Sequence, residues 1–445
     1  MMPPANQLNR KPQAPGRLLA ACLVGLLLAT SALGCLGQIE PPLSDVGPLG
    51  SGEPAPPATG PQTAAVSLFD LTPAEIAPTW TLEYDRPVSA ALAADGGHVL
   101  IGRSYGSVRN STQWSAMLYD ATGEELWRQD YQQVRYRTIE IELLGPEPII
   151  SSALFASRNS GTLYVSGLDG AIGWERSVDS SVCLASDAAG ERIYGIDRGR
   201  SQAFVVNART GRELATIAVA DGASLQVAPG GEALVVSSRR LILLSRDGRV
   251  RARVPVNQDF TMIALSPGGD AVYAVTGGAD SSAYRLDTAG QVVWRQELAA
   301  GGSNAIAVGP NADLILAYNV GVENSFVLLD ARDGTIVRRN ELAPVENAKD
   351  QFVRGVKFLP EGAGLLLDYC VAYDRTTGHA EEHSLLYFDA EGNFAARLDL
   401  GRNVNVLTSE DGQACVVVTT APLAGAGPST NKVQLYNLRP LFGQE

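Results

Sequence analysis

The sequence predicts an all-β fold: a single β-propeller of about eight four-stranded blades over residues 79–441. Three observations support this prediction. Two short phrases alternate along the chain at a nearly constant spacing, tryptophans recur at one place within the repeat, and the last repeat lacks a strand that the start of the folded region can supply.

The first phrase is a glycine-containing turn followed by an apolar strand, as in "VAPGGEALVVS" and "LSPGGDAVYAV". The second is a strand, an Asp–Gly-type turn and another strand, as in "RLDTAGQVVWRQ" and "LLDARDGTIVRR". Copies recur about every 35–50 residues with four short strands each, which is typical of a propeller. Turn residues of these types are needed for positive φ and side-chain-to-backbone bonds, so the aspartates are expected to be structural. The units begin near residues 88, 132, 179, 222, 259, 303, 352 and 404; the second is the least regular, which leaves the count at seven or eight.

The tryptophans indicate how the ring closes. Trp127, Trp174 and Trp294 occupy the same place on the fourth strand, strand D, of their repeats. Trp80 in "TWTLEY" has the same setting, yet no strands A to C precede it, while the last repeat ends without a strand D. We therefore predict that strand 79–85 completes the last blade, which would remove exposed strand edges.

The spacing Asp-x-x-Gly-x-x-x-Trp in "DATGEELW" and "DTAGQVVW" resembles the tryptophan-docking motif of quinoprotein-type (PQQ-like repeat) eight-bladed propellers. The resemblance covers 79–441. It implies the fold; the dehydrogenases of that type also carry adjacent cysteines, calcium ligands and a catalytic Asp, and this chain has no adjacent cysteines. The non-enzymatic branch includes a bacterial lipoprotein of the outer-membrane β-barrel assembly machine. We therefore expect no bound cofactor and no enzymatic activity.

Residues 1–34 resemble an export signal, with Arg10, Lys11 and Arg17 before the uncharged run "LLAACLVGLLLATSALGC". "SALGC" resembles a bacterial lipoprotein box with Cys35 as the lipidated residue; an uncleaved membrane anchor and a plain secreted form are the alternatives. Residues 35–78 are rich in Pro, Gly, Ser and Ala, which predicts a flexible tether. The folded part should therefore lie outside the cytoplasm, in the cell envelope, on either side of a bacterial membrane.

Charge narrows the choice of partners. The net charge is −13, and removing the three basic residues of the leader would leave −13 − 3 = −16. An acidic chain repels phosphate backbones and anionic lipid, so we expect no nucleic-acid binding and membrane contact only through the N-terminus. We expect a monomer.

Apart from Cys22 in the leader and Cys35 at the predicted lipidation site, three cysteines remain: Cys183, Cys370 and Cys415. All lie in apolar strand-like runs, and small buried side chains are the simplest interpretation. A Cys370–Cys415 disulfide stays open, because connectivity cannot be deduced from sequence.

The stretch "HAEEH" (379–383) matches the H-x-x-E-H pattern of inverted zinc peptidases. Such a site needs both histidines one helical turn apart on one helix face. Here the stretch is expected in the loop between strands B and C of the seventh blade, as a solvated loop tip. The sequence thus predicts neither a metal site nor a catalytic group.

Long, irregular B–C loops distinguish one face of the predicted propeller, which B–C and D–A connections share. Loops on a rigid scaffold commonly carry function, and Arg and Trp are favoured interface anchors. Ordinary solvated loops, with arginines paired to nearby acids, are the alternative interpretation. The residues predicted to bind a partner on this face are Tyr105, Arg109, Trp114, Arg198, Arg200, Arg239, Arg240, Asp259, Asn304 and Asn403.

Three functional hypotheses follow. The first is a membrane-tethered scaffold that binds an envelope protein or peptide through this face. The second is a cofactor-dependent, quinoprotein-like enzyme or sensor with a site at the channel mouth near Asp259, Asn304 and Asn403. The third is a carbohydrate or cell-wall binding module, for which Tyr105 and Trp114 are a small supply of aromatic side chains.

Overall fold

The structure is a computed structural model of the 445-residue chain. It describes residues 63–66, 71–86, 88–105, 112–134, 138–145, 149–157, 160–179, 182–219, 224–228, 230–237, 240–255, 260–277, 281–298, 303–311, 313–320, 325–373, 381–402, 404–419 and 430–443. Within these ranges, no helix is long and apolar enough to cross a membrane.

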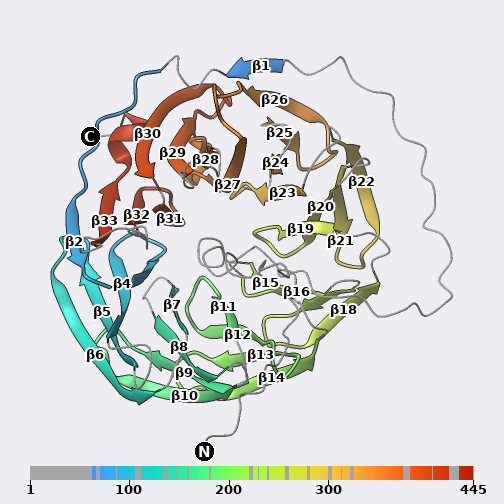
Figure 1. The fold of residues 1–445 in the computed structure, drawn as a ribbon. Coiled ribbons are helices and arrows are strands. Elements are labelled where there is room, and N and C mark those ends of the chain that lie inside the picture. Colours follow the sequence, from blue (N-terminus) through green and yellow to red (C-terminus); the bar gives the residue numbers. More distant parts are fainter. Residues whose placement is uncertain are drawn as a thin grey trace, which may run out of the picture.

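The described strands form a ring of four-stranded blades around a central axis, as Figure 1 shows. This confirms the predicted all-β propeller. The first five blades are separate antiparallel sheets of four consecutive strands. Their strands are β3 (Val88–Leu92), β4 (His98–Tyr105), β5 (Thr112–Asp120) and β6 (Glu125–Val134); β7 (Thr138–Leu144), β8 (Ile149–Ser157), β9 (Ser160–Ser166) and β10 (Ile172–Val178); β11 (Val182–Ser186), β12 (Arg192–Asp197), β13 (Gln202–Asn207) and β14 (Glu213–Ala218); β15 (Ser224–Val227), β16 (Ala233–Ser237), β17 (Arg240–Leu244) and β18 (Val250–Pro255); and β19 (Phe260–Leu265), β20 (Ala271–Thr276), β21 (Ser282–Asp287) and β22 (Val292–Glu297).

The next two sets of four strands are joined into one nine-stranded sheet, because Val320 of β24 pairs with Phe352 of β27 and a further strand is added outside. The remaining set contains the chain's last three strands. Two 3₁₀ helices are present in this part of the chain: η1 (Pro360–Gly362) between β27 and β28, and η3 (Arg439–Phe442) after β33. The strands are β23 (Ser303–Val308), β24 (Leu314–Val320), β25 (Ser325–Asp330) and β26 (Ile336–Leu342); β27 (Asp350–Phe358), β28 (Leu365–Ala372), β29 (Glu381–Phe388) and β30 (Phe394–Arg402); and β31 (Val404–Thr408), β32 (Ala414–Thr419) and β33 (Asn431–Asn437) with β2 (Trp80–Tyr84).

The ring closes as predicted, through the N-terminal strand β2. It pairs antiparallel with β33 from Trp80 opposite Leu435 to Tyr84 opposite Asn431. The Thr79 N–H adds a hydrogen bond of 2.7 Å to the Leu435 carbonyl. Strand β2 is therefore the outermost strand of the last blade, and segments about 350 residues apart in sequence share one sheet.

Apolar side chains are buried between consecutive blades. Eight clusters of buried residues lie one at each junction between neighbouring sets of four strands in the described part of the chain. The junction that closes the ring brings Val416 and Val433 of the last blade against Val99 and Met117 of the first. Because a neighbouring blade covers each face of a sheet, the inner strands of that sheet consist of nearly continuous runs of apolar residues.

Each tryptophan on a strand D, Trp80 of β2 included, packs on a glycine in the next blade. The glycines lie in the turns between strands C and D and have positive φ, 87° at Gly123 and 75° at Gly170. A Cβ on Gly123 would stand 2.8 Å from Trp80 Cγ, and one on Gly170 would stand 2.9 Å from Trp127 Cδ2. Glycine is thus required at these positions for two reasons: the positive φ of the backbone and the close approach of the indole.

Part of the predicted tether, 35–78, is not a free coil. Residues Thr63–Val66 form β1, which pairs in parallel with the outer strand β26. Residues 71–79 run around the outside of the ring to β2 (Figure 1), with the Ala74 N–H 2.6 Å from the Arg397 carbonyl of β30. Ala74 and Ile76 also pack against the core between the last two blades. The prediction was wrong for these residues, because the outer edges of β26 and β30 offer unpaired backbone groups to a passing chain; residues 35–62 lie outside the described residues.

Candidate functional site

The face formed by B–C and D–A connections carries several ion pairs between described residues. The Arg103 guanidinium contacts Asp85, which links the first blade to the strand that closes the last. Arg103 also lies 5.4 Å from the centre of the Tyr84 ring. The hydrogen bond from Arg103 holds the pKa of Asp85 below its usual range. These contacts therefore join two neighbouring blades where the ring closes.

Arg200, predicted as a binding residue, lies at a comparable junction. Its guanidinium is 3.0 Å from Asp179 at the end of the second blade and 3.6 Å from Asp197 in its own blade. The buried Asp197 accepts a hydrogen bond of 3.2 Å from the Asp179 backbone N–H. The bond to Asp179 raises the pKa of Arg200. Arg200 thus links two blades and presents a half-exposed side chain on the predicted face.

Trp114 belongs to the packing between the first two blades. It is half-buried on β5 and lies against the cluster that contains Leu100, Leu118 and Ile141. Its indole N–H is buried without a hydrogen-bond partner among the described residues. Trp114 is therefore first a packing residue, and its replacement would disturb the ring as well as any binding surface.

The structure describes some of the other predicted binding residues fully, some by their backbone alone and some not at all. Arg198 follows β12, and Arg240 is the exposed first residue of β17. Tyr105 ends β4 opposite Gln113, and Asn304 lies in β23 opposite Asn319; only their backbones are described. The remaining residues lie outside the described ranges: Arg109, Arg239, Asp259, Asn403 and the predicted lipidation site Cys35.

The "HAEEH" stretch does not form a solvated loop tip as predicted. Strand β29 begins at Glu381, so its last three residues lie in the sheet, while His379 is outside the described residues. His383 pairs across the strands with Cys370 of β28 and is only 1% exposed. The alternation of inward residues through Glu381, His383 and Leu385 extends the strand beyond the apolar run, which is why the loop was predicted too long.

A polar cluster surrounds His383 within the seventh blade. Its Nε2 is 3.7 Å from Cys370 Sγ and 3.8 Å from Glu381 Oε2, and its Nδ1 is 3.7 Å from Asp368 Oδ1. Arg354 of β27 forms an ion pair of 2.5 Å with Glu381. Burial raises the pKa of the Cys370 thiol to about 12. Sequence reasoning missed this cluster because it treated cysteine and histidine separately; a strand pairing of the two runs would have placed them side by side.

The described cysteines Cys183, Cys370 and Cys415 form no disulfide bonds with one another. Burial raises the pKa of Cys415 as well as that of Cys370. The open alternative of a Cys370–Cys415 disulfide is therefore not what the structure shows, and Cys370 faces a histidine instead.

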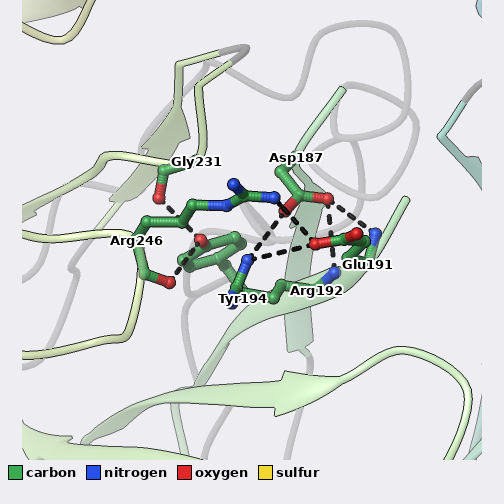
Figure 2. Close-up of polar contacts among 6 residues, drawn as sticks. All are labelled: Asp187, Glu191, Arg192, Tyr194, Gly231 and Arg246. Carbon is green, nitrogen blue, oxygen red and sulfur yellow. Dashed lines mark hydrogen bonds and ion pairs between the residues drawn. The ribbon is translucent and has the colours of Figure 1, made fainter. Parts of the chain in front are cut away.

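The opposite face, formed by A–B and C–D turns, carries a junction between the third and fourth blades (Figure 2). The Tyr194 hydroxyl lies 2.6 Å from the Gly231 carbonyl and 3.2 Å from the Arg246 carbonyl. The Arg246 guanidinium is 2.7 Å from Glu191 and 3.9 Å from the buried Asp187.

Asp187 also organises its own turn in this junction. Its carboxylate accepts hydrogen bonds from the backbone N–H groups of Glu191, at 2.8 Å, and Arg192, at 3.2 Å. Burial raises the pKa of Tyr194, which keeps its hydroxyl protonated as a donor. These groups are all engaged in joining two blades, which agrees with the prediction that turn aspartates are structural.

A family model described as outer membrane protein assembly factor BamB matches residues 112–259 and 243–420. Together these ranges cover more than half of the chain. The chain belongs to this family. Membership agrees with the PQQ-like propeller expected from the Asp–Gly–Trp motif, and the family's name connects it with the outer membrane of the cell envelope.

Solved structures show the same fold at low sequence identity. The propeller of Dos1 is 13% identical with a TM-score of 0.54, over 82% of this chain and 96% of that one. The C-terminal WD40 domain of Sif2 is 8% identical with a TM-score of 0.55, over 82% and 99%. Sqt1 from Chaetomium thermophilum is 15% identical with a TM-score of 0.51, also over 82% and 99%. At these identities the likeness concerns the fold alone. A comparison with curated proteins finds no significant match.

Proposed function

We propose that this member of the family is an exported, membrane-tethered, eight-bladed and non-enzymatic scaffold that binds an envelope protein or peptide. Its binding surface is the face of B–C and D–A connections. The observation that carries the proposal is the family match over residues 112–420, since the family is named for assembly of outer membrane proteins. The partner is accordingly a protein that takes part in that assembly.

Three features of the described residues support a scaffold. Polar contacts such as those of Arg103 and Arg200 join neighbouring blades on the proposed face, which gives its loops a rigid base. The buried carboxylates Asp187 and Asp197 accept backbone hydrogen bonds and are thus used within the fold. Pairing of β2 with β33 covers the outer edge of β33 and joins the two ends of the folded chain in one blade.

The test is capture of the partner by crosslinking in the native cell envelope, followed by identification of the crosslinked residues. The informative variant is Arg109→Glu combined with Arg240→Glu, which reverses the charge of two residues predicted from the sequence to bind the partner. We expect it to reduce the captured partner at least tenfold, because reversed charges on a docking surface are repulsive.

The matched control reverses two charges on the opposite face. Arg249 and Arg332 lie in turns between strands C and D, and their side chains are 85% and 84% exposed. Arg249→Glu with Arg332→Glu should capture as much partner as the natural chain. Equal loss in both double variants, or crosslinks confined to the face of Arg249 and Arg332, would overturn the proposed surface.

A further inference from the structure

We propose that Cys370, His383 and Glu381 of the seventh blade bind one zinc ion. Cys370 comes from β28, and Glu381 and His383 come from β29, the neighbouring strand. Ligand atoms of the three side chains all lie within 4.8 Å of one another. Thiolate, imidazole and carboxylate together form a donor set that zinc favours.

The distances suit a tetrahedral ion. Zinc bonds of about 2.3 Å to sulfur and about 2.0–2.1 Å to nitrogen or oxygen place two ligand atoms roughly 3.3–3.6 Å apart. The His383 Nε2 lies 3.7 Å from Cys370 Sγ and 3.8 Å from Glu381 Oε2. Shifts of a few tenths of an ångström would therefore bring these two ligand pairs to zinc-binding separations.

The other imidazole nitrogen supports the same interpretation. His383 Nδ1 and Asp368 Oδ1 face each other at 3.7 Å, and both are buried without a hydrogen-bond partner among the described residues. Buried polar atoms without a partner are costly and need an explanation. A carboxylate behind the metal-bound histidine, which accepts its Nδ1–H, is the usual second contact of a zinc ligand. Asp368 is placed to orient His383 in this way.

Arg354 contacts one of the proposed ligands, and the charges of the cluster still balance. It pairs with Glu381, whose carboxylate has further lone pairs for a metal. Without zinc, Asp368, Glu381 and Arg354 sum to −1 if Cys370 is a thiol and His383 is neutral. Zinc adds two positive charges, and ionisation of the thiol adds one negative charge, so the bound cluster sums to zero.

The exposure of the ligands indicates where the zinc ion can enter, and their chemistry indicates which ions can bind. His383 is buried, whereas the side chain of Glu381 is 32% exposed, so the ion can enter from the side of Glu381. Three protein ligands leave the fourth position for water. Magnesium and calcium prefer oxygen ligands and should not compete.

The experiment measures zinc binding to the purified full chain by equilibrium dialysis, with magnesium and calcium as comparison ions. We expect one zinc per chain, abolished binding in Cys370→Ser and His383→Gln, and a roughly 10–100-fold loss of affinity in Asp368→Asn, the orienting carboxylate. Cys183→Ser and His98→Gln are matched controls that should keep full binding. Circular dichroism of each variant without metal checks that it is folded.

A second measurement uses the natural chain, so that it does not depend on a variant's folding. Cobalt added in place of zinc should produce the absorption of a tetrahedral, thiolate-bound ion, and this signal should be lost when zinc is added. The proposal is overturned by no zinc binding to the natural chain, by equal binding in the Cys370 and His383 variants, or by cobalt absorption without a thiolate ligand.

Discussion

The indole of Trp80 lies on Gly123, 43 positions further along the chain and in the next blade around the ring. Trp80 is on the strand that closes the last blade, and Gly123 is in a turn of the first, so this contact crosses the closure. The same relationship joins Trp127 to Gly170, Trp174 to Gly211 and Trp294 to Gly334. One packing unit therefore serves both ordinary blade junctions and the point where the two ends of the chain meet.

Replacing Gly123 by alanine should destabilise the fold more than the same change at Gly362. Both glycines have positive φ, 87° and 73°, which costs alanine roughly 1–2 kcal/mol. At Gly123 the new Cβ would also stand 2.8 Å from Trp80 Cγ, whereas nothing lies within 4 Å of one at Gly362. Overpacking should add about 1–3 kcal/mol at Gly123. Denaturant unfolding of both variants measures the difference; equal losses would mean that the indole moves aside freely.

Replacing tryptophan by phenylalanine should cost more at position 174 than at 127. The Trp174 indole N–H donates a hydrogen bond of 2.7 Å to the Ala208 carbonyl. The Trp127 indole N–H has no such partner among the described residues. The net value of one hydrogen bond predicts a difference of about 1 kcal/mol in the free energy of unfolding. A larger loss for Trp127→Phe would contradict the assigned contact.

Acid should weaken the fold through its turn aspartates. The Asp120 carboxylate accepts bonds from the Thr122 hydroxyl at 2.7 Å and the Glu124 backbone N–H at 2.9 Å. The bond from Thr122 is the main cause that holds the pKa of Asp120 below its ordinary value of 3.8. A lowered folded-state pKa stabilises the fold above the unfolded pKa, and this stability is lost as pH falls through the folded value.

The corresponding measurement is the free energy of unfolding between pH 7 and pH 3. Asp120→Asn keeps an acceptor for the turn but does not titrate, so its stability should fall less over this range than that of the natural chain. Parallel curves would show that Asp120 contributes nothing to the acid dependence.

The predicted lipid anchor can be tested at Cys35 and at Cys22, which lies within the leader. Cys35→Ser should move the chain from the membrane fraction to the soluble fraction or block its processing, because the lipidated thiol is removed. Cys22→Ser is the control, since "LAAC" lies too close to Arg17 for an apolar region to precede it. Retention of both variants in the membrane at the same molecular mass as the natural chain would favour an uncleaved apolar anchor, because blocked processing of Cys35→Ser would leave a larger chain.

Periodicity predicted most of the fold, because turns and strands are local. The glycine turns, the D-strand tryptophans and the closing strand 79–85 are each a short pattern with a direct structural cause. The strand β1 on β26 was missed, since its residues carry no strand pattern and pair only through their backbones. The predicted binding face was recognised as a set of loops, but Asp85, which contacts Arg103, and Asp179, which contacts Arg200, lie in other blades and could not be predicted from neighbours in sequence.

The sequence by itself determined the repeat, the propeller and the route by which the ring closes, because these depend on turn chemistry and apolar alternation within a few residues. Only the tertiary structure decided the environment of His383. Three extra residues in a strand turned an expected loop tip into a buried imidazole beside Cys370, Asp368 and Glu381. Strand register is set by pairing across a sheet, and a shift of two or three residues at its end changes burial completely.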